Sequence, residues 1–308
     1  SWLKARTIYQ QTEVFRFGNP IVDDWEGKVN AWPLDEGLID YVETTNYYPS
    51  ENDFSNFNVI ANKKLKVEGE LIDASIIDAS LLSSKLHEIG GNEANVAIGY
   101  HAIEFLLWGQ DSSLETAGLR KHTDYLPGEG NNDRRRSYLL LVSELLIEHL
   151  SWLDTTWQAD GKGRKNFLNK QSPGTDILTG IATLAGFELA SERIATALDS
   201  GDPEDEHSCF SDQTHLDIKA NYNGIKNVYL GLGANNEKFS PSVSEFVKET
   251  NKLLHEEIMN NLNSISNNIE NITVPFDKML TETKNGSGRL AAEETVSNLI
   301  ILAESFLK

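Results

Sequence analysis

Cysteine is almost absent from this chain of 308 residues, and the single one, Cys209, cannot form an intrachain disulfide. We expect it to be a small buried residue rather than a nucleophile. Cysteine use this low suits the cytosol and the bacterial periplasm equally. Long apolar runs are also missing, since no stretch approaches the 18 residues that indicate a membrane-spanning helix. The sequence therefore predicts no transmembrane span.

Basic residues are scarce, with 27 lysines and arginines against 47 aspartates and glutamates, which gives a net charge of -20. Nucleic acids and anionic membrane surfaces attract patches of Lys and Arg, so this balance argues against both as partners. An acidic surface suits solubility and a general attraction for cations. With 39% hydrophobic residues, the chain can bury one large core or two modest ones.

The most informative feature that is present is the motif Gly99-Tyr-His101-Ala-Ile-Glu104, which lies within the apolar stretch 94–108. Two side chains three positions apart on a helix project from the same face. Burying an imidazole and a carboxylate together is costly unless they pair, meet other polar groups or hold a metal. The motif therefore predicts a site. The structural alternative is a hydrogen-bonded pair that only fixes packing.

The motif is expected on a helix over 94–108. Asn92 can cap its beginning, and Gly109 stands where a glycine commonly ends a helix. This helix is apolar nearly all round, which predicts a position in a core. We expect Gly99 to let a neighbouring backbone come close.

The rest of the chain is also predicted to be helical. Apolar residues at spacings of three and four predict helices over 134–157, 177–198 and 290–307, and a helix of some thirty residues after Pro241. The segment 65–79 is ambiguous, and no region is rich in strands. The pattern indicates an all-α protein.

Further carboxylates and imidazoles are candidate metal ligands, because these groups suit iron, manganese or zinc. One lies on an early helix, and the others lie in an acidic loop of the second half that has a solvated turn as its alternative interpretation. These candidates are Glu13, Asp202, Glu206, His207 and His215. Arginine forks could bind a ligand carboxylate or hold the site's glutamates in place. The supporting residues are Gly99, Arg16, Trp32, Asp35, Glu188, Arg193 and Asp212. The run Arg134–Arg136 is interpreted as a solvated helix start.

Known metal templates do not match the motif. Zinc peptidases use His-Glu-x-x-His or His-x-x-Glu-His, but Phe105 follows Glu104 here. A catalytic zinc needs about three protein ligands, and His101 with Glu104 supplies at most two. Di-iron bundles repeat Glu-x-x-His on two helices, whereas this chain has the reverse order once. Whether the chain is an enzyme stays open, with Glu104 as the catalytic candidate if it is a peptidase.

Four blocks of the chain, in order, resemble the imelysin-like family. Gly-x-His-x-x-Glu followed by Phe-Leu-Leu-Trp-Gly looks like its signature, at 99–109. The segments 5–17, 29–42 and 201–215 are similar to its early helix, to its next landmark and to a later block of its iron-regulated branch. The resemblance implies two helical-bundle halves packed around a shared polar cleft. The first half, 1–165, carries the motif, and the second is 166–308.

The resemblance also implies export to the periplasm or cell surface of a bacterium. It is compatible with a lipid anchor on the protein before processing. Because the chain opens inside an expected helix, we expect Ser1 to follow a leader and further helical sequence that have been removed. The family is classed among metallopeptidases through an insulin-cleaving member, while other relatives are tied to iron uptake.

These observations favour an exported protein that binds a metal ion or a metal chelate and serves iron acquisition. Iron is the favoured metal and zinc is the other option, with His101 and Glu104 as ligands or as groups that orient them. Other envelope iron-uptake proteins are its candidate partners. The alternatives are a zinc-type metallopeptidase and a binding module for a polymer or protein in which the His–Glu pair is structural.

Overall fold

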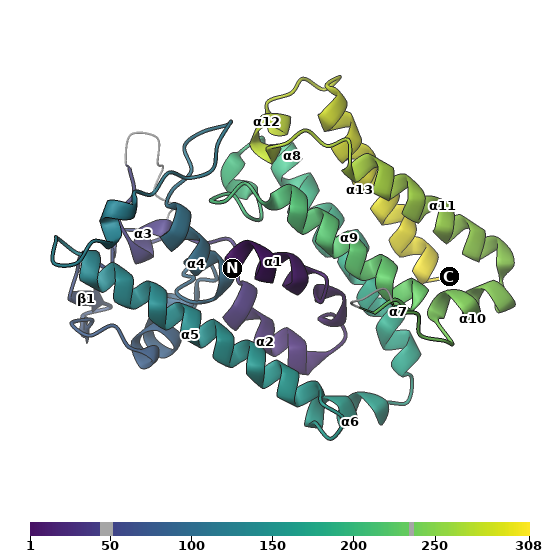
Figure 1. The fold of residues 1–308 in the computed structure, drawn as a ribbon, viewed down its shortest axis with the longest axis horizontal. Coiled ribbons are helices and arrows are strands. Elements are labelled where there is room, and N and C mark those ends of the chain that lie inside the picture. Colours follow the sequence, from purple (N-terminus) through teal and green to yellow (C-terminus); the bar gives the residue numbers. More distant parts are fainter. Residues whose placement is uncertain (44–51, 234–236) are drawn as a thin grey trace. The chain divides into compact units, whose positions relative to one another are not determined.

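The computed structural model describes residues 1–43, 52–233 and 237–308 (Figure 1). The chain divides into two compact units. The terminal unit combines Ser1–Asp24 with Lys165–Lys308, and the middle unit is Trp25–Arg164. Residues 1–24, which the sequence analysis assigns to the first half, are thus part of the terminal unit.

The terminal unit is built from helices. Its α-helices are α1 (Trp2–Gln10), α7 (Pro173–Thr183), α8 (Thr196–Ser200), α9 (Thr214–Leu230), α10 (Val243–Thr250), α11 (Lys252–Ile269), α12 (Phe276–Leu280) and α13 (Ser287–Phe306). A π-helical segment, η5 (Leu184–Ala195), joins α7 to α8, so that helical backbone continues over 173–200. Two short 3-10 turns complete the unit, η1 (Glu13–Phe15) and η6 (Pro203–Asp205).

The core of the terminal unit forms where α13 packs against η5 and α11 (Figure 1). Every third or fourth side chain of α11 is buried there: Ile258, Leu262, Ile265 and Ile269. Burying this stripe, at about 1.5–3 kcal/mol for each large aliphatic side chain, holds the helix in place.

Helix α1 packs against α9, which explains why the first residues belong to the terminal unit. The backbones of the two segments approach closely at Gly224, where a Cβ atom would collide with the carbonyl oxygen of Gln11. Only glycine allows this contact.

The middle unit contains α3 (Glu36–Ile39), α4 (Gly99–Trp108), α5 (Asn132–Trp157) and the hairpin of β1 (Lys64–Val67) and β2 (Glu70–Asp73). Short helical turns are η2 (Leu81–Leu86), η3 (Ile89–Gly91) and η4 (His122–Tyr125). Helices α2 (Pro20–Asn30) and α6 (Lys162–Leu168) cross the boundaries between the units. The antiparallel hairpin occupies the segment whose sequence is ambiguous. The all-α prediction is confirmed, since this hairpin is small.

The predicted start of the motif helix is wrong, because α4 begins at Gly99 and not near 94. Residues 94–98 give their backbone groups to partners outside the helix. The carbonyl of Ala94 accepts from Asp35, and the carbonyl of Ala97 accepts from the Tyr138 hydroxyl at 2.8 Å. The predicted end at Gly109 is confirmed.

The single helix predicted after Pro241 is also wrong, because Asn251 divides it into α10 and α11. The backbone of Asn251 leaves the helical region, with φ -148° and ψ 86°, and its side chain accepts a hydrogen bond from the Leu254 amide that caps α11. Helix α5 agrees with the prediction over 134–157. Across the described residues, no helix combines the length and the hydrophobicity needed to cross a lipid bilayer.

Candidate functional site

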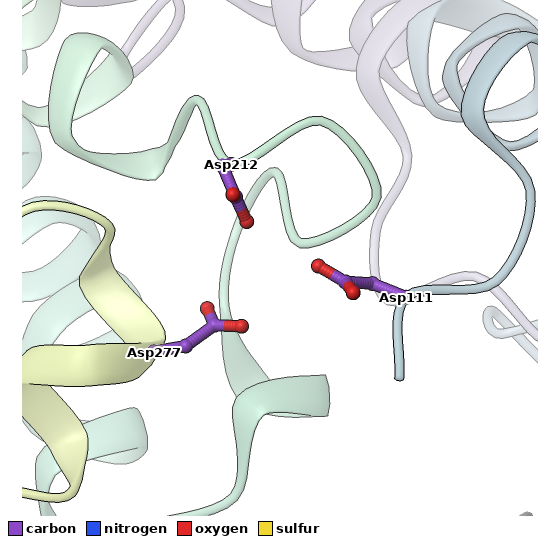
Figure 2. Close-up of side chains that lie close together, drawn as sticks. All are labelled: Asp111, Asp212 and Asp277. Atoms are coloured by element: carbon purple, nitrogen blue, oxygen red, sulfur yellow. The ribbon is translucent and has the colours of Figure 1, made fainter. Parts of the chain in front are cut away.

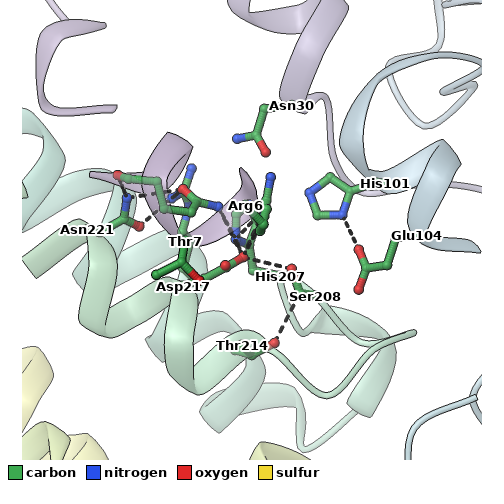
Figure 3. Close-up of polar contacts among 12 residues, drawn as sticks. Arg6, Thr7, Asn30, His101, Glu104, His207, Ser208, Thr214, Asp217 and Asn221 are labelled. Atoms are coloured by element: carbon green, nitrogen blue, oxygen red, sulfur yellow. Dashed lines mark hydrogen bonds and ion pairs between the residues drawn. The ribbon is translucent and has the colours of Figure 1, made fainter. Parts of the chain in front are cut away.

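The predicted pair lies buried on α4. Nδ1 of His101 and Oε2 of Glu104 are 2.9 Å apart, and the exposed fractions of the two residues are 1% and 0% (Figure 3). An imidazole that donates Nδ1–H to a carboxylate carries its lone pair on Nε2. Carboxylates orient metal-bound histidines in the same way. The pair can therefore present a nitrogen ligand whose ring orientation is fixed by Glu104.

Close backbone packing fixes the start of α4 beneath this pair. Gly99 has φ +90°, and a Cβ atom there would lie 2.6 Å from the carbonyl oxygen of Val29. This confirms the close approach expected at Gly99. The contact brings the end of α2 beside α4, and there the buried amide of Asn30 donates to Glu26 at 3.0 Å. These two polar residues are not among the predicted site residues, although their spacing of four on a helix places them on one face.

A cavity of about 190 Å³ lies elsewhere in the middle unit. Its lining includes Gln110, Ser113 and Arg120, and neither His101 nor Glu104 contributes to it. The cavity is therefore separate from the predicted pair.

The arginine run at the start of α5 is not a solvated helix start, and that interpretation is wrong. Arg135 is 5% exposed and binds both carboxylate oxygens of Asp40, with Nε 2.6 Å from Oδ2. Arg120 donates to the same Oδ2 atom at 2.7 Å. Arg134 donates at 2.8 Å to four backbone carbonyls, those of Val59, Ile60, Ala74 and Ser75.

In the terminal unit, Asp217 of α9 is the centre of a buried polar network (Figure 3). Its Oδ2 atom accepts from Arg6 at 2.9 Å, from Gln10 at 3.1 Å and from Ser208 at 2.7 Å, and lies 3.0 Å from Nδ1 of His207. Burial alone would raise the pKa of Asp217, but Arg6 and these hydrogen bonds hold it well below its usual range. Asp217 therefore stays ionised.

His207 is neutral in this network. Burial first, and then the positive charges of Arg193 and Arg6, lower the pKa of His207 to about 4, although Asp217 opposes the shift. The Nη2 atom of Arg6 lies 3.3 Å from each ring nitrogen. An atom equally far from both nitrogens at this distance lies over the ring face, because Cε1 stands between them in the plane. The Arg6 contact is thus not along the in-plane Nε2 lone pair.

A second network, buried around Arg193 and Glu13, includes four sequence candidates. Arg193 pairs with Glu13, donates to Asn221 at 2.6 Å and donates to Glu188 at 2.9 Å. Burial would raise the pKa of Glu13, but the charge and the hydrogen bond of Arg193, together with the charge of Arg6, outweigh burial and lower the pKa. Arg16 contacts Glu188 at 3.7 Å. Their ion pairs offset the free-energy cost of removing these charged side chains from water.

The remaining sequence candidates lie in different settings. Asp202 is exposed and accepts from the Glu204 amide at 3.0 Å, so it caps η6. Glu206 is fully buried, and neither of its carboxylate oxygens has a hydrogen-bond partner among the described residues. His215 is partly buried, and burial lowers its pKa. Asp35 accepts from Asn52 at 2.9 Å.

Trp32 lies half-buried after α2, and Asp212 follows η6 with φ +55°. The partners of His207, which are Arg6, Gln10 and Asp217, are not among the site residues predicted from the sequence. The pairing of Arg6 with Asp217 spans 211 positions, so no local pattern signals it.

One family model matches nearly the whole chain. The family model described as Imelysin, peptidase M75, matches residues 1–305. "Iron-regulated protein A" of Synechococcus elongatus (strain ATCC 33912 / PCC 7942 / FACHB-805) is 23% identical over 245 residues, which are 75% of this chain and 51% of that protein. The chain thus spans about half the length of this curated relative.

A solved structure from Parabacteroides distasonis ATCC 8503, described as a candidate iron-regulated protein A precursor, has the same fold. Its TM-score is 0.65 at 20% identity, and the match covers 99% of this chain and 81% of that one. The matched family model spans nearly the whole sequence, including the buried pair of α4. The chain belongs to the imelysin family.

Proposed function

We propose that this protein binds a metal ion, with iron favoured over zinc, through His101 and Glu104. The observation that carries the proposal is the buried contact of 2.9 Å between His101 Nδ1 and Glu104 Oε2. With Nδ1–H directed at Glu104, a neutral ring would offer its Nε2 lone pair to a metal. A buried structural pair would give the same contact, so binding itself is the test.

Two further observations support a role in iron acquisition. A family member of known sequence is named for its regulation by iron, and so is a structural relative. The net charge of -20 favours the approach of cations over that of anions. We propose that the protein acts in the periplasm or at the cell surface of a bacterium, where other envelope iron-uptake proteins are its partners. Cell fractionation tests the location.

Metal binding is tested by calorimetry and elemental analysis of the full chain, purified without chelators or metal affinity. We expect one iron per chain in the unaltered protein and at least a tenfold loss of affinity in His101→Ala. Glu104→Gln keeps a side chain of similar shape but loses the carboxylate, so it also weakens binding. The matched control is His122→Ala, an exposed histidine of the same unit. Equal affinity in all of these proteins rejects the proposal.

The alternative is a metallopeptidase, and the family description favours it. It predicts cleavage of an unfolded peptide that stops with a chelator and in Glu104→Gln. The buried Phe105 occupies the position where an inverted zinc motif has its second histidine, which favours binding over hydrolysis. Metal binding without any such cleavage would support the first proposal alone.

A further inference from the structure

Two carboxylates of the terminal unit face each other away from either buried network. Asp212 lies in the loop before α9 and Asp277 lies in α12, and Figure 2 shows their side chains directed toward one another. Their carboxylate oxygens lie within 4.8 Å. Figure 2 also draws Asp111, which belongs to the middle unit.

Asp277 is buried without a partner for one of its oxygens. The residue is 2% exposed, and its Oδ1 atom has no hydrogen-bond partner among the described residues. Burial raises the pKa of Asp277 to about 6. Burying a carboxylate oxygen without a hydrogen-bond partner from the protein costs free energy. Such a carboxylate is the kind of group that a bound cation would stabilise.

Negative charge nearby makes the ionised form of Asp277 still less favourable. When both are ionised, the carboxylates of Asp212 and Asp277 carry like charges with oxygens within 4.8 Å of each other. These carboxylates are therefore close enough to repel one another. One divalent cation between them would convert mutual repulsion into shared attraction.

The donor atoms indicate the class of cation. Carboxylate oxygens alone, without sulfur or imidazole, suit hard cations. Two oxygens on opposite sides of Ca²⁺ are at most about 5 Å apart, because each Ca–O distance is about 2.3–2.6 Å. The corresponding limit for Mg²⁺ is about 4 Å. The observed separation, within 4.8 Å, is compatible with Ca²⁺ in the geometry as it stands.

We propose that Asp212 and Asp277 bind a hard divalent cation of the calcium class in the terminal unit. This site does not depend on the metal proposed at His101 and Glu104, and it differs from it in ligand chemistry. With two carboxylate ligands we expect a dissociation constant of about 0.1–1 mM, as in extracellular calcium modules.

The test is calorimetric titration of the full chain with CaCl₂, and separately with MgCl₂. We expect saturable Ca²⁺ binding that weakens at least tenfold in Asp277→Asn and in Asp212→Asn. Asparagine tolerates the positive φ of Asp212, so this second variant keeps the fold even if a change at the buried Asp277 does not. Glu249→Gln, an exposed acidic residue of α10, is the matched control and should bind as the unaltered protein does.

His101→Ala separates this proposal from the previous one, because it should leave Ca²⁺ binding unchanged while iron binding fails. No saturable Ca²⁺ binding up to 10-fold above about 1 mM would overturn the proposal. Equal affinity in Asp212→Asn and the control would overturn it too. Tighter binding of Mg²⁺ than of Ca²⁺ would overturn the assignment to the calcium class.

Discussion

At the scale of single residues, two histidines share one arrangement in separate units. His101 directs Nδ1 at Glu104, and His207 directs Nδ1 at Asp217. Each carboxylate selects the tautomer with the lone pair on Nε2. Around His207, burial first and then the charges of Arg193 and Arg6 lower the pKa of the ring and keep it neutral. A histidine–carboxylate pair therefore also occurs in a network where protein groups supply the hydrogen-bond partners without a metal.

The neutral His207 predicts a pH dependence of stability. Its pKa is about 4 in the folded chain and 6.5 ordinarily, so the unfolded chain binds a proton more readily between these values. The free energy of unfolding should fall by up to about 3 kcal/mol as pH drops from 6.5 to 4. Urea titrations across this range measure it. His207→Asn should flatten the dependence, and His122→Asn should leave it unchanged.

Removing the negative charge of Asp217 should be strongly destabilising. Asp217→Asn leaves the guanidinium of Arg6, which is 1% exposed, without its carboxylate. Breaking one side of a buried ion pair costs about 3–5 kcal/mol. Chemical denaturation measures the loss, with Asp199→Asn, an exposed residue of α8, as the control. A cost below about 1 kcal/mol would contradict the central place of Asp217 in the network.

At the scale of elements, the start of α4 depends on one glycine. Gly99→Ala adds a Cβ atom 2.6 Å from the Val29 carbonyl and forces a side chain into φ +90°. We expect about 2 kcal/mol or more of destabilisation, together with weaker metal binding. Thermal unfolding and calorimetry measure the two effects. Gly174→Ala in α7 is the control, since its Cβ would meet no atom within 4 Å.

The boundaries and contacts of these elements show which structural features the sequence predicts. The ends of α4 and α5 follow from glycine and from apolar periodicity, which act within a few residues. The beginning of α4 does not, because Asp35 and Tyr138 take up the backbone groups of residues 94–98. The role of Arg134 depends on carbonyls some 60 to 75 positions away. Contacts at such separations leave no periodic signal.

The contacts of the candidate sites also fall into those that the sequence predicts and those that it does not. The His101–Glu104 contact follows from helix geometry, since both residues lie on one turn. The contact between Asp212 and Asp277 arises from tertiary packing of two separate segments, and the sequence predicts only that the first lies in an acidic loop. Asp277 carried no local signal at all.

At the scale of the whole molecule, the terminal unit is assembled from both ends of the chain. Arg6, Gln10 and Glu13 supply the partners of polar groups on α9 and η5. Deleting residues 1–18 should therefore expose buried charges in this unit. Hydrogen exchange should show faster exchange in α9, while α5 of the middle unit keeps its protection. Equal protection of α9 with and without these residues would show that α1 is dispensable.

The split terminal unit also sets an order of events during biosynthesis. The middle unit is one uninterrupted stretch, so all of its contacts become possible once residue 164 has been made. The first 24 residues must wait until α9 emerges, nearly two hundred positions later. Until then their charged side chains stay hydrated, because the groups they will neutralise do not yet exist. Long-range closure of this kind is slow, and it makes docking of the amino-terminal segment a late step in folding.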